Sequence, residues 1–228
     1  MAVRRRSRGD RQFVVLGLGR FGTSVARTLY QLGFDVLGID MDEQKVQEVS
    51  DQITHAVQAD CTDEEALSAL GVRNFDVGVV AIGDLEASVL AVVILQELGV
   101  RTVIAKAVSE LHGRVLEKVG ANHVVYPERD MGVRVAHYLV PGNVLDYFPL
   151  APGYSLLEIK SPDRFAGHSL RELDLRGRYG AIIVAVRRGE VINPAPGPEF
   201  QLEAADVLVA LGRDEDLERL EQAGAENA

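Results

Sequence analysis

The sequence predicts an α/β fold: a Rossmann-type, doubly wound parallel sheet followed by a small α+β C-terminal lobe. Strand-like and helix-like segments alternate over residues 11–140, and a glycine-rich turn follows the first strand. After residue 143 the pattern becomes strand-rich. Alternating strands and helices form right-handed βαβ units, which build a parallel sheet covered by helices on both faces.

The elements of the first part are short and regular. Apolar, β-branched runs predict strands at 13–16, 36–39, 55–57, 77–82, 102–105 and 123–125. Segments with helical periodicity predict helices at 22–32, 43–51, 64–70, 86–98, 110–119 and 132–139. Thr62 with Glu65 indicates a capping box. Glycines in the left-handed conformation are expected where helices end, at Gly33, Gly71, Gly99 and Gly120.

Residues 144–223 are predicted to form the second lobe. Its strands are expected at 145–150, 155–159, 181–186, 191–193 and 206–211, with brief helices at 168–173 and 214–223. The proline-rich segment 193–198 is expected to be an exposed loop, because proline cannot donate to a sheet ladder. About 80 residues enclose only a small core, so dimerisation would add buried surface that the lobe needs.

Composition limits the function. The chain has 228 residues, of which 47% are hydrophobic and 25% charged, and a net charge of −10, which disfavours a general nucleic-acid binder. Residues 1–10 are predicted to be a flexible basic tail; the alternative is a weak contact with acidic lipids or a partner. Cys61 is the only cysteine, which excludes an intrachain disulfide and fits a reducing cytoplasm. No apolar run is long enough to predict a membrane-spanning helix.

The turn after the first strand has the glycine spacing of a phosphate-binding loop. Its residues are Gly17, Leu18, Gly19, Arg20, Phe21 and Gly22. In such a loop Gly17 permits the tight turn, Gly19 lets a phosphate approach the backbone N–H groups, and Gly22 allows close packing of helix on strand. The guanidinium of Arg20 suits a terminal phosphate, because it offers a bidentate contact. We therefore expect the phosphates of a nucleotide at this turn.

Further strand ends are expected to line the same crevice. Asp40 ends the second strand, where an acid bonds the ribose hydroxyls and repels a 2′-phosphate, so NAD, ATP or ADP is favoured over NADP. Asp60 is predicted to accept from an adenine amino group, unless it only neighbours a helix cap. Lys106 is predicted to contact phosphate, unless it is a solvated surface lysine. Gly83 follows the fourth strand and is also expected to line the crevice.

These motifs, together with residues 59–62, 80–83, 106–107 and 127–132, resemble the RCK domain, also called KTN, which regulates potassium channels and transporters. Residues 169–180 and 193–196 resemble the companion C-terminal lobe. The resemblance covers nearly all of the chain except the arginine tail. It is greatest to cytosolic regulators of the KtrA and TrkA type.

The resemblance implies a cytosolic, nucleotide-sensing regulatory subunit rather than an enzyme. In this family ATP and ADP compete for the Rossmann site, and homodimers assemble into an octameric ring. The ring docks on a membrane K⁺-translocating subunit of the KtrB or TrkH type. The expected location is therefore cytoplasmic and peripheral on the inner face of the membrane, with no nucleic-acid partner.

The resemblance also assigns roles to individual residues. The expected nucleotide-binding residues are Gly17, Leu18, Gly19, Arg20, Phe21, Gly22, Asp40, Asp60, Cys61, Ala81, Ile82, Gly83 and Lys106. Arg20 matches the arginine that reaches the γ-phosphate, and Glu128 matches an acid that holds a divalent cation, Mg²⁺ or Ca²⁺. From the residues alone, Glu128 is only an acid favoured at a helix start. Cyclic di-AMP in the C-terminal lobe would contact the residues Arg176, Ile183 and Pro194.

Two alternatives keep the Rossmann site but change its role. One is an NAD(H)-binding, TrkA-like regulator, and the other is an NAD-dependent oxidoreductase. An oxidoreductase needs a proton donor close to the nicotinamide. In the second region His168, Tyr154 and Tyr179 are predicted to lie in turns, so the sequence disfavours this alternative.

Overall fold

The computed structural model describes residues 11–139 and 143–225. The chain folds into two compact units, with the division between Glu128 and Arg129. The predicted domain limits, 11–140 and 144–223, differ in placing residues 129–139 with the first part, and they stay predictions. The predicted tail at 1–10 lies outside the described residues.

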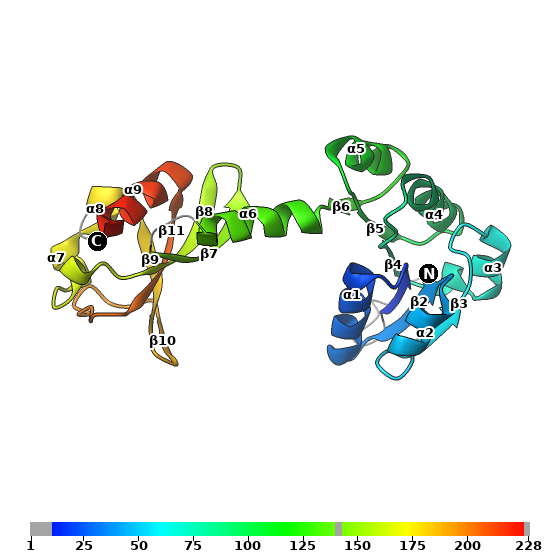
Figure 1. Cartoon of the computed structure of the whole chain (residues 1–228), viewed down its shortest axis with the longest axis horizontal. Helices are drawn as coiled ribbons and strands as arrows, with labels where there is room; N and C mark the ends of the chain where they lie inside the picture. Colours follow the sequence, from blue (N-terminus) through cyan, green and yellow to red (C-terminus); the bar gives the residue numbers. More distant parts are fainter. Residues whose placement is uncertain (1–10, 140–142, 226–228) are drawn as a thin grey trace, which may run out of the picture. The chain divides into compact units, whose positions relative to one another are not determined.

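The first unit contains a six-stranded parallel sheet in the order β3-β2-β1-β4-β5-β6 (Figure 1). Its strands are β1 (Gln12–Leu16), β2 (Asp35–Asp40), β3 (His55–Gln58), β4 (Val77–Val80), β5 (Thr102–Lys106) and β6 (His123–Val125). This is the strand order of dinucleotide-binding folds, and the order reverses between β1 and β4. The predicted Rossmann-type sheet is confirmed.

Helices cover both faces of this sheet. They are α1 (Arg20–Gln31), α2 (Glu43–Val49), α3 (Glu64–Ala69), the short 3₁₀ helix η1 (Val72–Asn74), α4 (Leu85–Glu97) and α5 (Glu110–Lys118). On β1, Val15 packs in a cluster with Ala26 of α1 and Val46 of α2. Val14 and Leu16 point the other way, into the cluster that holds residues of α3, α4 and α5. The alternation follows from the two-residue period of a strand.

Side-chain caps fix where most of these helices begin. The capping residues of α2, α3, α4 and α5 are Asp42, Asp63, Asp84 and Ser109. The predicted capping box at Thr62 is wrong, because Asp63 is the cap and the Thr62 hydroxyl donates to Asp60 instead. The glycines predicted at helix ends all have positive φ, as expected: Gly33, Gly71, Gly99 and Gly120.

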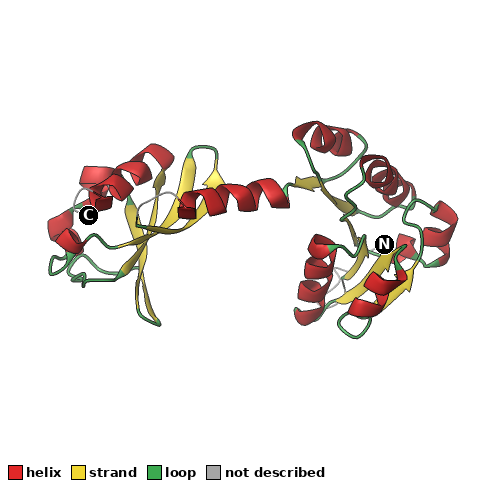
Figure 2. Ribbon diagram, in the orientation of Figure 1, coloured by secondary structure: helices red, strands yellow, loops and turns green. Residues whose placement is uncertain are grey.

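The second unit is built on a five-stranded antiparallel sheet in the order β10-β9-β11-β8-β7. Figure 2 shows its strands in yellow. Helix α6 (Pro127–Leu139) begins in the first unit and continues into the second. The other elements are β7 (Val144–Ala151), β8 (Tyr154–Lys160), η2 (Asp163–Phe165), α7 (Leu170–Leu173), α8 (Leu175–Tyr179), β9 (Ile182–Arg188), β10 (Val191–Pro194), β11 (Val207–Arg213) and α9 (Asp214–Ala225). Pro194 ends an edge strand, where proline is tolerated. The α+β lobe is therefore confirmed, while α8 was not predicted.

Two ion pairs of the second unit involve a carboxylate that is buried or half-buried. The Arg134 guanidinium of α6 donates to Asp146 of β7 at 2.7 Å, and Arg188 donates twice to the fully buried Asp206, at 2.8 Å each. The core beneath the sheet includes Ile159.

Helix α6 begins at Pro127, earlier than predicted, because proline suits the first position of a helix. In the part of the chain that the structure describes, no helix is long and apolar enough to span a membrane.

Candidate functional site

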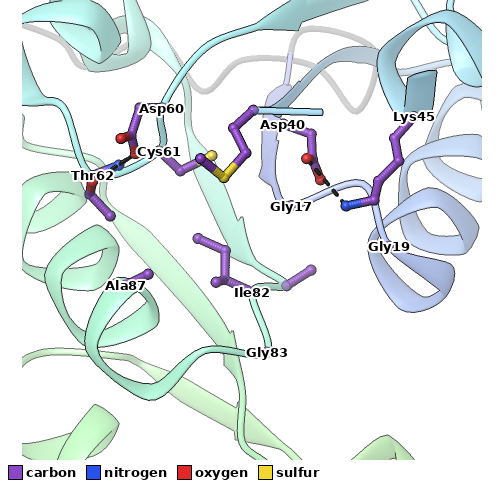
Figure 3. A pocket seen from close by; sticks show the side chains of 12 residues that line it. Gly17, Gly19, Asp40, Lys45, Asp60, Cys61, Thr62, Ile82, Gly83 and Ala87 are labelled. Carbon is purple, nitrogen blue, oxygen red and sulfur yellow. Dashed lines mark hydrogen bonds and ion pairs between the residues drawn. The ribbon is translucent and has the colours of Figure 1, made fainter. Parts of the chain in front are cut away.

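A pocket of about 230 Å³ opens at the carboxyl ends of the central strands, where the strand order reverses (Figure 3). Ligands of open α/β sheets bind at this position. The pocket is lined by Gly17, Gly19, Asp40, Met41, Lys45, Asp60, Cys61, Thr62, Ala81, Ile82, Gly83 and Ala87. Eight of these residues were predicted as site residues. Met41, Lys45, Thr62 and Ala87 were not.

Two glycines of the loop are required by the fold. Gly17 has φ +94°, in the left-handed region, and its N–H donates to Ile39 O at 2.8 Å. A Cβ on Gly22 would lie 1.9 Å from Gly17 O, so α1 packs against the turn only because Gly22 has no side chain. Both observations match the roles that the loop pattern predicts for these positions.

Two other glycines are not required by the fold. Gly19 has φ −70°, which any residue adopts, and a Cβ built on it meets no described atom within 4 Å. Gly83 has neither a positive φ nor, among the described residues, a neighbour within 4 Å of its Cβ. Both line the pocket. The missing side chains therefore leave open space where a ligand would contact the backbone.

The start of α1 differs from the starts of the other helices of this unit. Its N-cap, Gly19, has no side-chain hydrogen bond, and its first turn has no acidic residue in the described structure. The helices α2 to α5 each have a side chain that accepts from the first turn. The first-turn N–H groups and the positive end of the dipole of α1 are thus available to an anion.

Asp40 connects the glycine loop to the strand beside it. It is 6% exposed, and its Oδ2 accepts the Leu18 N–H at 2.7 Å. Its Oδ1 accepts the Asp42 N–H at 2.9 Å and lies 3.4 Å from the Lys45 ammonium, as the dashed line in Figure 3 shows. Asp40 therefore holds the loop in place and also lines the pocket. The contact of this carboxylate with ribose stays a prediction.

Residues after β3 form another wall of the pocket. Asp60 Oδ1 accepts from the Thr62 hydroxyl at 2.7 Å and from the Thr62 N–H at 2.8 Å, and these bonds lower the pKa of Asp60. Cys61 Sγ lies 3.6 Å from Ile39 O. The pKa of the Cys61 thiol is raised to about 12, chiefly by burial. The thiol is therefore neutral and contributes apolar surface to the pocket wall.

The remaining predicted residues of this unit lie outside the pocket. The side chain of Leu18 is in the core, Phe21 is half-buried in the first turn of α1, and Arg20 is exposed and lines a second cavity. Lys106 Nζ donates to Glu128 Oε1 at 2.9 Å. This bond is the main cause that lowers the pKa of Glu128, and the charge of Arg20 adds to the effect.

The predicted cation site has one protein carboxylate. Among the described residues, no group of three or more His, Cys, Asp or Glu side chains could hold a metal ion. A divalent cation at Glu128 would therefore need other ligands, such as phosphate oxygens or water. The metal role of Glu128 stays a prediction.

The predicted residues of the second unit lie on three elements. Arg176 is exposed on α8, and Pro194 is exposed at the end of β10. Ile183 of β9 is half-buried and packs against the core of the unit. A role in binding cyclic di-AMP stays a prediction for all three.

The fold and the pocket together define a Rossmann-type nucleotide-binding unit joined to a small antiparallel lobe. Two family models match these parts: the TrkA-N domain at residues 13–127 and the TrkA-C domain at residues 155–223. The chain therefore belongs to the TrkA family of RCK-domain proteins, as the motifs indicated.

Two relatives from Bacillus subtilis support this assignment. The chain is 45% identical over 213 residues to the Ktr system potassium uptake protein C of Bacillus subtilis (strain 168), which covers 93% of this chain and 96% of that protein. It is 39% identical over 216 residues to the Ktr system potassium uptake protein A of the same organism, covering 94% and 97%. The GsuK RCK domain has a similar structure, with a TM-score of 0.68 and 20% identity. That match covers 98% of this chain but 49% of the GsuK chain, and it shows the fold alone.

Proposed function

We propose that this chain is a regulatory subunit of a potassium uptake system and that its pocket binds an adenine nucleotide, ATP or ADP. The two B. subtilis relatives are potassium uptake proteins that align over nearly their whole length. The pocket supplies the regulatory input. It lies where a Rossmann-type sheet binds nucleotides.

The open space at Gly19 is the observation that carries the proposal. The fold needs no glycine at this position, yet the space beside it adjoins the uncapped start of α1. A pyrophosphate fits this environment, because its oxygens can accept from several N–H groups at a helix N-terminus. The pocket of about 230 Å³ is smaller than a typical site for a whole ligand. We infer that it holds the adenosine and that the phosphates extend along the loop.

The charged residues beyond the pocket are placed to read the terminal phosphate. Arg20 begins α1 directly after Gly19 and is exposed. Lys106 and Glu128 form an ion pair close enough to Arg20 for its charge to affect Glu128. ATP differs from ADP in one phosphate group, so only contacts with that group can favour one conformation over another. A coupling of about 1–3 kcal/mol per site is typical.

A divalent cation, Mg²⁺ or Ca²⁺, would use the Glu128 carboxylate together with phosphate oxygens. The cation would supply positive charge between the carboxylate and the phosphates. Lys106 holds the same carboxylate oxygen in this structure, so the ammonium has to yield that position to the cation.

We further infer that the subunit works as a homo-oligomer, in the expected form of dimers that build an octameric ring. Helix α6 supports this, since its apolar residues Met131, Val133, Val135, Tyr138 and Leu139 are exposed. The ring would act on a membrane K⁺-translocating subunit of the KtrB or TrkH type, from a cytoplasmic, peripheral position. Cyclic di-AMP near Arg176, Ile183 and Pro194 would be a second input.

The nucleotide part of the proposal is tested by thermal-shift titration of the full chain with ATP, ADP and NADH. Stabilisation rises as RT ln(1 + [L]/Kd), so the tightest ligand gives the largest shift at equal concentration. We expect ATP and ADP to exceed NADH. A clear preference for NADH would favour the NAD(H)-binding regulator or the oxidoreductase. The variant Gly19→Ala should show a clearly smaller shift with ATP and ADP while its own melting temperature stays nearly unchanged.

A further inference from the structure

A second cavity, of about 810 Å³, adjoins the nucleotide pocket, since Gly19 and Lys45 line both. It lies between α1 and α2, which provide nearly all of its lining. On α1, the residues Arg20, Ser24, Arg27 and Gln31 are spaced by four, three and four positions, so they share one face of the helix. Apart from Leu18 and Gly19, every lining residue is polar or charged.

The charge of this cavity is opposite to that of the chain. Three cations, Arg20, Arg27 and Lys45, face one carboxylate, that of Glu48. The chain as a whole has a net charge of −10. Lys45 is paired with Asp40 at 3.4 Å and with Asp42 at 3.6 Å, so Arg20 and Arg27 are the cations of the lining without an ion pair among the described residues. A cluster of cations in an acidic protein raises the local concentration of small anions.

Arg27 is the unusual residue of the cluster. Its Nε is buried and has no hydrogen-bond acceptor among the described residues. Two arginines of the second unit differ from it: Arg134 is paired with Asp146, and Arg188 with Asp206, each through two hydrogen bonds. A buried donor without an acceptor is destabilising. No carboxylate among the described residues pairs with Arg27, so the guanidinium that lines the cavity is available to an anion.

We propose that this cavity is an anion site that binds a small, multiply charged phosphate compound in addition to ADP. In the proposed function Arg20 is used by the terminal phosphate of ATP, so the ADP-bound chain is the form that takes this second anion. Guanidinium groups bind phosphate through two parallel hydrogen bonds. The hydroxyl of Ser24 adds a donor on the same face of α1. Arg27 and Ser24 line this cavity and not the nucleotide pocket, so a ligand held by them is not the nucleotide's adenosine. The volume admits a di- or triphosphate.

The test is calorimetric titration of inorganic tripolyphosphate into the full chain without divalent cations. ADP is titrated first, and tripolyphosphate is then added to the ADP-saturated protein. We expect one further site per chain, with an affinity that falls as salt is added. If ADP itself does not bind, the proposed function is wrong. Tripolyphosphate is then titrated into the nucleotide-free chain, and the variants below decide whether it binds in this cavity.

Three variants identify the site. Arg27→Gln should weaken tripolyphosphate binding about tenfold or more. Glu48→Gln removes the only carboxylate of the cavity lining and should strengthen binding about threefold, a change that misfolding cannot produce. Arg114→Gln, at an exposed position on α5, is the matched control and should leave binding unchanged.

Three results would overturn the proposal. The first is an absence of tripolyphosphate binding. The second is binding that Arg27→Gln and Glu48→Gln leave unaltered. The third is full competition between tripolyphosphate and ADP, which would mean that the cavity only receives the phosphates of the nucleotide.

Discussion

Lys106 Nζ lies 2.9 Å from Glu128 Oε1, so the residue expected to contact phosphate and the residue expected to hold a cation are each other's partners. The Lys106 side chain is 13% exposed and that of Glu128 is 68% exposed. The lysine is therefore the fixed member of the pair, and the carboxylate is the accessible one. A cation that binds Glu128 competes with this ammonium.

Replacing Lys106 should increase the effect of a divalent cation. In Lys106→Gln the carboxylate loses its charged partner, so its pKa rises toward the ordinary value and the oxygen becomes free for Mg²⁺. We expect a larger Mg²⁺-dependent rise in melting temperature at saturating ATP than in the wild type. Glu128→Gln should abolish the Mg²⁺ effect in both backgrounds. Equal Mg²⁺ effects in wild type and Lys106→Gln would contradict the competition.

The two glycines at either side of the α1 start should respond in opposite ways. Gly19→Ala places a methyl group in open space, so the unfolding free energy should fall by less than about 1 kcal/mol, while nucleotide affinity falls about tenfold or more. Gly22→Ala places a methyl group against Gly17 O and should cost about 3 kcal/mol or more. Urea denaturation and calorimetric titration measure both quantities. Unchanged ATP and ADP binding in Gly19→Ala would exclude phosphate from the loop.

Arg20 should distinguish ATP from ADP. Arg20→Ala removes the charged contact proposed for the terminal phosphate, so ATP affinity should fall about tenfold or more, while ADP affinity changes by less than about threefold. Because Arg20 is exposed at the start of α1, its removal should not unfold the protein. Arg114→Ala is the control for the loss of one positive charge. An equal loss of ATP and ADP affinity in Arg20→Ala would show that Arg20 does not read the terminal phosphate.

The ion pair of Arg188 and Asp206 should make the free energy of unfolding depend on pH in the acidic range. Hydrogen bonds from Arg188 lower the pKa of the fully buried Asp206 below its ordinary value. The pair therefore stabilises the fold above that ordinary value, and the contribution is lost as pH falls through the folded pKa. Arg188→Met should lower the unfolding free energy by about 3–5 kcal/mol at pH 7, because it leaves a buried charge unpaired. The difference between variant and wild type should shrink below about pH 4, and a difference that is constant from pH 7 to pH 3 would contradict this.

Cys61 should be unreactive in the native protein. Its thiol pKa of about 12 leaves on the order of a thousandfold less thiolate at pH 8 than an ordinary thiol. Iodoacetamide should therefore label Cys61 far more slowly in buffer than in urea. Because the folded pKa is raised, the related stability is present below pH 9 and is lost as pH rises above it. Equal labelling rates in buffer and urea would show that the pocket wall opens.

The sequence predicted the first sheet well because most of its strands contain a short apolar run between turn signals. Its boundaries are less exact: the run at 77–82 continues past Val80, where β4 ends, and Ala81 and Ile82 become pocket wall. Ala81 N–H still donates to Leu16 O at 2.7 Å, so the end of the strand is gradual. Helix α8 was missed because it is short and contains Gly177, and its cap, Asp174, has a left-handed φ of 42°.

The glycine loop and Asp40 were identified by their spacing, whereas Lys45 was not. In sequence Lys45 is one of several charged residues on an exposed helix, and only the fold brings its ammonium to Asp40. The pairing of Lys106 with Glu128 was missed for the same reason, since these residues are on different elements. Local patterns give the position of a residue on its own element, and contacts between elements require the tertiary structure.

Small-angle scattering of the full chain saturated with ATP, compared with the same chain saturated with ADP, tests the central claim most directly. If the terminal phosphate sets the conformation, the two scattering curves differ in wild type and coincide in Arg20→Ala. Superimposable curves for ATP and ADP in the wild type, with both nucleotides bound, would contradict the claim.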